Sequence, residues 1–232
     1  MARERRARLQ ERLDHIAPND PPVQQICIGS AAILAVTGST VILMSDEEIG
    51  ATVVASNVGA TAVEDLQFTL GEGPCLQAWR TGQAVLEPEL LDASAARWPE
   101  FSRQAVATGA RAVFALPLQL GAIRLGVLYL YRSAPGMLSS EQLADGFELA
   151  AMATALLLDA QAGAAQGELG AGLAGDWTNR GIVHQATGMV AAQLGVSLAD
   201  AIARLRARAF GTGRSVYDVG VDVLERRIRL EE

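Results

Sequence analysis

The sequence predicts an α/β (α+β) domain with an antiparallel sheet, followed by an all-α bundle of three short helices. Short apolar strand patterns alternate with helical patterns over residues 20–162. Residues 163–175 are rich in Gly and Ala, which is typical of a linker. Three amphipathic patterns follow over residues 176–232, each closed by a turn signal. A chain of 232 residues is long enough for these two modest domains.

An Arg- and Glu-rich segment, residues 1–19, precedes the first domain and predicts a helix over residues 2–16. Its thin apolar stripe consists of Leu9, Leu13 and Ile16. We expect a solvated helix that docks onto a neighbour through this stripe, or alternatively a dimer contact. The Pro-rich residues that follow end this helix.

The first predicted domain, residues 20–162, contains both helices and strands. In chain order, we expect a helix over 23–34, strands over 40–44 and 51–55, short helices over 61–66 and 75–79, a strand over 84–86, a helix over 98–107, strands over 112–118 and 123–131, and a long helix over 139–162. The strand over 123–131 is apolar at both alternations, which predicts a central strand covered on both faces. The long helix has a heptad-like apolar stripe, which favours core packing or a parallel dimer seam.

The three C-terminal helices are delimited by their turn residues. Gly195 ends the first helix, Ser197 caps the second, and Ser215 opens the third. The apolar face expected for the first helix consists of Ile182, Ala186, Met189, Val190 and Leu194. The third helix is expected to bury Val216, Val219, Val223, Leu224 and Ile228.

Composition excludes several classes of enzyme and cofactor site. All 19 basic residues are arginines, which excludes a phosphate-binding loop with its lysine and a Schiff-base lysine. The only histidines, His15 and His184, lie outside the central domain, which argues against a Ser-His-Asp triad or a histidine-ligated metal there. The only cysteines, Cys27 and Cys75, supply too few ligands for zinc, haem or an iron–sulfur cluster. We therefore expect no enzyme, and the cofactor remains unknown.

Charge and hydropathy indicate the compartment and the partners. Residues 27–160 carry six arginines and fourteen acidic residues, whereas residues 176–232 carry eight arginines and seven acidic residues. An acidic regulatory domain joined to an arginine-bearing module fits this division. No uncharged apolar run reaches the length of a membrane span, and the charged N-terminus lacks the apolar core of a secretory signal. The sequence thus predicts a cytoplasmic protein without a membrane partner.

The C-terminal segment contains a series of residues in a characteristic order and spacing. They are Gln185-Ala186-x-Gly188-Met189, Gly195-Val196-Ser197, Ala201, Leu205-Arg206 with Ala209, and Gly213-Arg214 leading to Asp218-Val219. In these residues the segment resembles an ANTAR domain, the RNA-binding module of bacterial transcription antiterminators. It departs from the family at Thr187, where Lys is usual, at Ile202, where an aromatic residue is common, and at Gly220, where Ala is usual. Losing the Lys removes a possible phosphate contact, which arginines could replace.

A second resemblance covers roughly residues 20–160. It rests on four groups of residues: Leu70-Gly71-Glu72-Gly73-Pro74-Cys75, Arg97-Trp98-Pro99-x-Phe101, Ala115-Leu116-Pro117-Leu118 and Leu125-Gly126-Val127-Leu128. In these the segment resembles a GAF domain, and the whole chain resembles the GAF–ANTAR transcriptional regulators common in actinobacteria. The resemblance implies a ligand pocket between the GAF sheet and its helices. It also implies that the ANTAR module binds paired RNA hairpins, the tandem stem-loops of nascent transcripts.

Five residues are candidates for contact with an unknown small-molecule ligand: Cys75, Trp79, Trp98, Phe101 and Phe114. The turn before Cys75 would present its thiol at a helix N-terminus, where a thiol pKa is lowered, so a redox role is also open. The alternative is that Cys75 is a buried packing residue. The aromatic side chains suit an apolar pocket or an ordinary core.

Eight residues are candidates for RNA contact: Gln185, Thr187, Arg204, Arg206, Arg208, Arg214, Ser215 and Tyr217. Arg204 and Arg208 share one helix face, and Arg206 points roughly the other way. Arg214 and Ser215 open the third helix, where backbone N–H groups can bind phosphate. The remaining three are possible readers of unpaired bases.

These features together predict a ligand-responsive RNA-binding antiterminator that acts as a homodimer. Pairing of two modules would raise affinity through effective concentration. One rival is a DNA-binding regulator, since three small helices also describe a helix-turn-helix, although base-reading polar residues are scarce. The other rival is a signalling protein that acts through a protein partner.

Overall fold

The computed structural model describes residues 2–45, 48–90, 97–163 and 177–230. The chain divides into two compact units, one that holds the sheet and one that begins at Asp176. Of the predicted linker over 163–175, only Gly163 is among the described residues, as the last residue of a helix.

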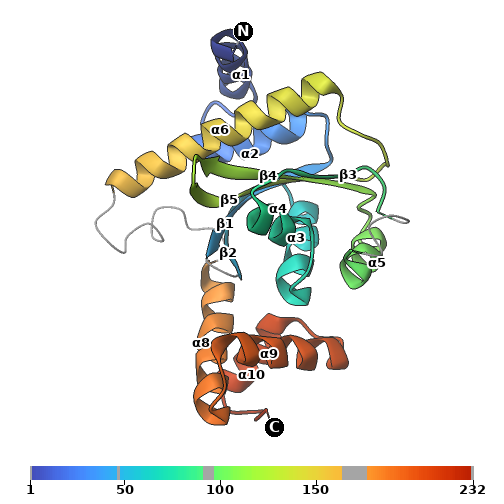
Figure 1. Cartoon of the computed structure of the whole chain (residues 1–232), viewed down its shortest axis with the longest axis vertical. Helices are drawn as coiled ribbons and strands as arrows, with labels where there is room; N and C mark the ends of the chain where they lie inside the picture. The colour runs from blue at the N-terminus through green and yellow to red at the C-terminus, as the bar shows by residue number, and fades with distance from the viewer. Residues whose placement is uncertain (1, 46–47, 91–96, 164–176, 231–232) are drawn as a thin grey trace. The chain divides into compact units, whose positions relative to one another are not determined.

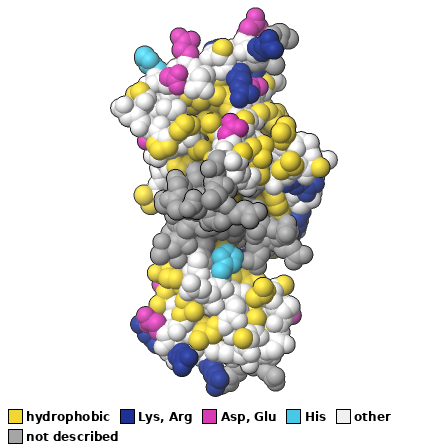
Figure 2. Space-filling view, turned by 90° about the vertical axis from the view of Figure 1, so that its left-hand side faces the viewer, with side chains coloured by type: hydrophobic (Ala, Val, Ile, Leu, Met, Phe, Trp, Pro, Cys, Tyr) yellow, Lys and Arg dark blue, Asp and Glu magenta, His cyan; other side chains and the backbone are white. Residues whose placement is uncertain are grey.

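The N-terminal helix packs onto the sheet-bearing unit. Helix α1 (Ala2–Ile16) contacts α2 (Pro22–Ile33) and α6 (Ser140–Gly163). Leu9 and Leu13 are buried, which confirms the predicted docking stripe, but Ile16 is 37% exposed. Arg8 Nη2 donates to Asp145 Oδ1 of α6 at 2.8 Å, and Arg5 pairs with the same carboxylate. At this end of the unit, Figure 2 shows basic and acidic side chains close together.

Five strands form one antiparallel sheet in the order β2-β1-β5-β4-β3. They are β1 (Gly38–Ser45), β2 (Glu48–Ala55), β3 (Val85–Glu87), β4 (Ala112–Leu120) and β5 (Ile123–Arg132). Strand β5 lies at the centre, and every residue from 125 to 131 is buried. The prediction of a central strand covered on both faces is therefore confirmed.

Helices cover both faces of the sheet (Figure 1). Helices α2 and α6 lie on one side, and α3 (Val58–Leu70), α4 (Pro74–Thr81) and α5 (Pro99–Ala107) lie on the other. Alternation along β4 sends Phe114 into the apolar core shared with α2 and α6, and Ala115 to the opposite face. Each face of the sheet thus has its own core.

Helix α3 is longer than the predicted segment over 61–66. It begins at Val58 because Asn57 caps it, with the Ala60 N–H donating to Asn57 Oδ1 at 2.9 Å. The other predicted elements of this unit are present with ends shifted by a few residues. The acidic turn expected between the first two strands falls partly on residues 46–47, outside the described ranges.

The C-terminal unit contains α8 (Trp177–Leu194), α9 (Leu198–Thr212) and α10 (Val216–Leu224), which all contact one another. Ser197 caps α9 by accepting the Asp200 N–H, and Ser215 caps α10 by accepting the Asp218 N–H. These caps confirm the predicted starts of both helices. The apolar residues of its core are Val183, Ala186, Val190, Ala201, Ile202, Leu205, Ala209, Val216, Val219 and Val223.

Two details of the predicted bundle core are wrong. Val183 and Thr187 are buried on α8, whereas Ile182, Met189 and Leu194 are only partly buried. Thr187 can occupy the core because its hydroxyl donates to the Val183 carbonyl at 2.8 Å. Ile228 was expected in the third helix, but α10 ends at Leu224.

No single described helix is long and apolar enough to cross a membrane; only the bent pair Gly181–Leu194 and Leu198–Thr212, which meet at 109°, reaches that composition jointly. Among the same residues, no group of three or more His, Cys, Asp or Glu side chains could hold a metal ion.

Gly220 provides a test of the bundle packing. A Cβ at this position would lie 3.5 Å from Ala186 Cβ and 3.6 Å from Ile182 Cγ2, which are ordinary contact distances. Gly220→Ala should therefore stabilise the bundle by about 1 kcal/mol through helix propensity. Gly213→Ala should destabilise it by about 1 kcal/mol, because Gly213 ends α9 at φ 64°. Hydrogen exchange of the α8 and α10 amides measures both changes, and equal effects of the two variants would contradict this packing.

Candidate ligand site and nucleic-acid interface

Two buried residues with unpartnered hydroxyl groups are neighbours on the sheet face that α3 and α4 cover. Thr40 of β1 is paired with Tyr129 of β5, so both side chains leave the sheet on the same face. Both residues are fully buried. Neither Thr40 Oγ1 nor Tyr129 Oη has a hydrogen-bond partner among the described residues. Such groups are rare in folded proteins, so these two hydroxyls can take up a partner such as a ligand or an ordered water.

Helix α3 adds polar side chains to the same layer. Glu64 and Gln67, which are three residues apart on one helix face, are both fully buried. Gln67 Oε1 accepts the Cys75 N–H at 2.8 Å, and Gln67 Nε2 donates to Cys75 Sγ at 3.1 Å. Gln67 therefore fixes the first turn of α4 against α3.

The environment of Tyr129 keeps its hydroxyl protonated. Burial raises the pKa of Tyr129 well above its ordinary value of 10.0, and the nearby Cys75 and Glu64 raise it further. At neutral pH this side chain is a phenol that can donate one hydrogen bond. Together with Thr40, it offers a buried pair of neutral hydroxyls.

The predicted turn over residues 70–75 connects α3, α4 and α5. Glu72 Oε1 accepts the N–H groups of Glu100 and Phe101, both at 2.8 Å, and so caps the start of α5 with a carboxylate. Gly73 has φ 144°, and a Cβ there would lie 2.6 Å from Gln67 Cγ. The turn requires Gly at this position because any side chain would displace Gln67.

Of the five predicted ligand residues, Cys75 lies in the polar layer beneath α3 and α4. Phe101 is buried and Trp98 is 5% exposed; their rings meet edge to face at 6.3 Å. Trp79 is partly buried, and its carbonyl accepts a hydrogen bond from Arg124 Nη1 at 2.8 Å. Phe114 lies on the opposite face of the sheet, in the core with α2 and α6. The structure therefore separates Phe114 from the other four residues.

Sequence reasoning missed the polar residues of this layer, namely Thr40, Glu64, Gln67, Glu72 and Tyr129. Glu64 and Gln67 carry the one usable signal, because they stand between the apolar residues Val63 and Phe68 on an amphipathic helix. In the sequence, Tyr129 cannot be distinguished from the apolar residues of a buried strand. Its missing hydrogen bond is visible only in the folded chain.

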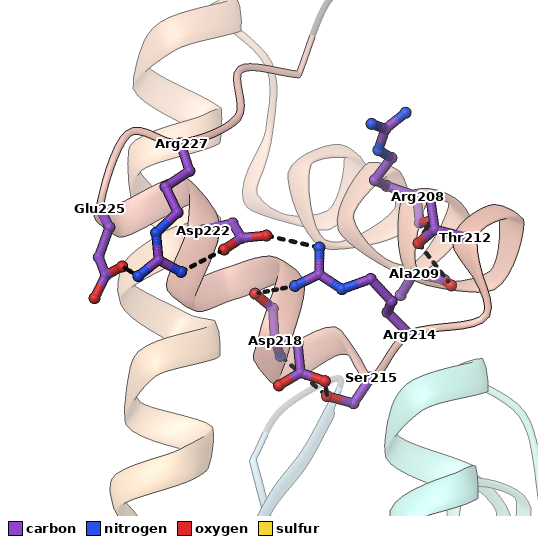
Figure 3. A network of polar contacts seen from close by, with 9 residues as sticks. All are labelled: Arg208, Ala209, Thr212, Arg214, Ser215, Asp218, Asp222, Glu225 and Arg227. Carbon is purple, nitrogen blue, oxygen red and sulfur yellow. Dashed lines mark hydrogen bonds and ion pairs between the residues drawn. The ribbon is translucent and has the colours of Figure 1, made fainter.

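Three predicted RNA-contact residues stabilise the C-terminal bundle instead, and Figure 3 shows two of them, Arg214 and Ser215. Arg214 Nη1 donates to Asp222 Oδ2 at 2.6 Å, and the guanidinium also reaches the Asp218 carbonyl. Arg214, followed by Arg227, holds the pKa of the Asp222 carboxyl below its ordinary value. The Ser215 hydroxyl caps α10, and Thr187 is 5% exposed with its hydroxyl bonded inside α8.

The other five predicted RNA-contact residues reach the surface to different degrees. Gln185 and Arg208 are exposed, whereas Arg204, Arg206 and Tyr217 are partly buried. The Arg208 guanidinium makes no hydrogen bond or ion pair within the described chain, and Figure 3 shows it directed away from the polar network around Asp222. Arg208 is therefore available to a partner.

Comparison with solved structures identifies the fold of the N-terminal unit. The GAF domain of a phosphoenolpyruvate-protein phosphotransferase from Coxiella burnetii is similar, with a TM-score of 0.52 and 14% identity over 68% of this chain and 96% of that one. A GAF domain/HD domain protein from Geobacter sulfurreducens has a TM-score of 0.51 and 14% identity, and the match covers 66% of this chain and 99% of that one. The GAF domain of an Acinetobacter phosphoenolpyruvate-protein phosphotransferase has a TM-score of 0.50 and 14% identity, and the match covers 68% of this chain and 95% of that one. The chain matches no family model, and no curated protein matches it. At this identity the likeness shows a GAF fold and nothing finer.

Neighbouring residues of β1 test whether the Thr40 hydroxyl is unpartnered. Thr40→Val removes a buried hydroxyl without a partner, so we expect unchanged stability or a gain of about 1 kcal/mol. Ser39 points to the opposite face, where its Oγ donates to the Cys27 carbonyl at 2.5 Å. Ser39→Ala should therefore cost about 1 kcal/mol. Urea unfolding of both variants measures the difference, and a large loss in Thr40→Val would show that its hydroxyl has a partner.

Cys27 should make stability depend on alkaline pH. Burial raises the pKa of its thiol from 9.0 to about 11. The folded chain therefore keeps a proton that the unfolded chain releases above pH 9, so stability falls as pH rises from about 9 to 11. Between about pH 8 and pH 10, the wild-type unfolding free energy should fall by about 1 kcal/mol more than that of Cys27→Ala. Parallel pH profiles for the two proteins would contradict this environment.

Proposed function

We propose that this chain is a signal-responsive, RNA-binding regulator of transcription antitermination. The observation that carries this proposal is the division of arginines in the C-terminal unit. Arg214 and Arg227 are bound to Asp222, whereas Arg208, Arg226 and Arg229 make no side-chain hydrogen bond or ion pair within the described residues. Free guanidinium groups on a small helical unit suit the phosphates of a nucleic acid.

The resemblance of this unit to an ANTAR domain makes RNA hairpins the nucleic acid that we propose. Arg208 would contact phosphates, while the exposed Gln185 and the partly buried Tyr217 would contact unpaired loop bases. Figure 2 shows arginine side chains next to apolar atoms on one face of this unit. Such a mixed surface suits a ligand that has both charged phosphates and flat, weakly polar bases.

The N-terminal unit is proposed to sense a small ligand. Its GAF fold and the unpartnered hydroxyls of Thr40 and Tyr129 support a buried polar ligand that accepts or donates hydrogen bonds. A direct redox role for Cys75 is less well supported, because its thiol is fully buried and held by Gln67. The sensed signal would then be a bound molecule.

Two copies are proposed to act together in the cytoplasm on paired hairpins of a nascent transcript, by binding and without catalysis. Phe147 of α6 is 46% exposed, and Ala151, one turn further, is also exposed. Such a surface stripe suits a seam between two copies. Each copy would supply one C-terminal unit, and the second hairpin would then bind at high effective concentration.

A signalling protein that acts through a protein partner is the second candidate. Thr187 and Arg214, both candidate RNA contacts, are used inside the bundle. A C-terminal unit with fewer contacts for phosphate and bases would favour this alternative.

The test is binding of the full chain to a tandem-hairpin RNA, to single hairpins and to duplex DNA, at about 50 and 200 mM salt. We expect preference for the tandem hairpins and a steep salt dependence. Arg208→Ala should weaken binding and reduce the slope of log affinity against log salt by about 1. Arg80→Ala removes one exposed arginine from the N-terminal unit and is the matched control. Equal affinity for all three nucleic acids would exclude antitermination.

A further inference from the structure

The C-terminal unit contains a cavity that none of the predicted RNA contacts lines. Its volume is about 510 Å³, and its lining consists of Met189, Gln193, Arg226, Ile228 and Arg229. The first two residues belong to α8, and the other three follow α10. A cavity of this size can hold one small organic molecule or one residue of a polymer.

A left-handed turn after α10 forms one side of the cavity. The Arg226 N–H donates to the Val223 carbonyl at 3.0 Å, and the Arg227 N–H donates to the Asp222 carbonyl at 2.8 Å. This is the hydrogen-bond pattern of a Schellman motif, in which the residue at the Arg226 position is most often Gly. Arg226 adopts φ 59° there, a conformation that side chains disfavour. An arginine thus stands at a position where glycine would be more stable.

The arginines that follow α10 have different roles. Arg227 is bound to Asp222 at 2.9 Å and also to Glu225, as Figure 3 shows. Its neighbours Arg226 and Arg229 line the cavity, and neither has an ion pair within the described chain. Two of these arginines therefore line the cavity, and the third holds the turn.

The rest of the lining complements these charges. Met189 and Ile228 supply apolar contact surface, and Gln193 supplies an amide that can both donate and accept. A free phosphate would be too small for this cavity and would leave the apolar side chains unused. A planar base flanked by phosphates matches all three kinds of lining.

We propose that this cavity receives one unpaired nucleotide of the bound RNA. The base lies against Met189 and Ile228, the Gln193 amide pairs with its edge, and Arg226 and Arg229 bind the flanking phosphates. This inference rests on the proposed function, because it assigns to RNA binding a site outside the residues expected from the family resemblance. The strained backbone at Arg226 then lowers the stability of the folded chain, and in return the Arg226 side chain contacts the ligand.

The test uses the full chain and the tandem-hairpin RNA. Arg226→Gly removes the guanidinium and relieves the strained turn, so it should raise the midpoint of thermal unfolding while weakening RNA binding about 10-fold. Arg229→Gln should weaken binding similarly without that rise. Each variant should reduce the salt slope by about 1. Arg12→Gln, an exposed arginine of α1, is the control and should change neither quantity.

A second measurement identifies the base. Abasic substitution of each unpaired RNA position in turn should weaken wild-type binding about 10-fold at one position. In Gln193→Ala the same abasic substitution should cost clearly less, because the two changes remove one shared contact.

The outcomes separate this inference from the proposed function. If the wild type binds no RNA, both fail. If it binds the tandem hairpins and the variants Arg226→Gly and Arg229→Gln bind equally well, the cavity inference is overturned and the proposed function stands. If these variants lose binding of an acidic peptide while their RNA binding is unchanged, the cavity belongs to a protein partner. That outcome also overturns the cavity inference.

Discussion

The burial of β5 on both of its faces is the constraint on which the N-terminal unit depends. A central strand that is apolar at both alternations needs a helical layer on each side of the sheet. Helices α2 and α6 form one layer with an apolar core, onto which α1 docks. Helices α3 and α4 form the other layer, in which Glu64 and Gln67 are fully buried and which covers the unpartnered hydroxyls of Thr40 and Tyr129. The single strand therefore separates the face packed by α2 and α6 from the face that carries the two unpartnered hydroxyls.

In the C-terminal unit, one carboxylate holds two of the arginines in the fold. Asp222 binds both Arg214 and Arg227, which join the start and the end of α10. A partly buried carboxylate with two guanidinium partners is worth more than an exposed ion pair, so these two arginines are committed to the fold. Arg208, Arg226 and Arg229, which make no side-chain hydrogen bond or ion pair within the described residues, can bind phosphate.

Much of the fold could be predicted from local patterns. The starts of α9 and α10 follow from Ser197 and Ser215, and the position of β5 follows from its unbroken apolar run, because caps and burial periodicity are local properties. The buried face of α8 differs from the predicted face because the Thr187 hydroxyl is hydrogen-bonded within the helix, so that Thr187 can be buried. The third helix was predicted to extend beyond the observed end of α10, because the turn at Arg226 is made by a residue type that does not indicate a turn in the sequence.

The sequence by itself determined the order of the elements, the central strand and the arginine-rich character of the last segment, since these depend on composition and periodicity along the chain. Only the tertiary structure decided which side chains share a site. Phe114 left the candidate ligand site because strand alternation directs it to the other face. Thr40 and Tyr129 entered that site because antiparallel pairing joins residues far apart in the sequence. Arg226 and Arg229 line one cavity with Met189 for the same reason, because packing brings together residues that are far apart in the sequence.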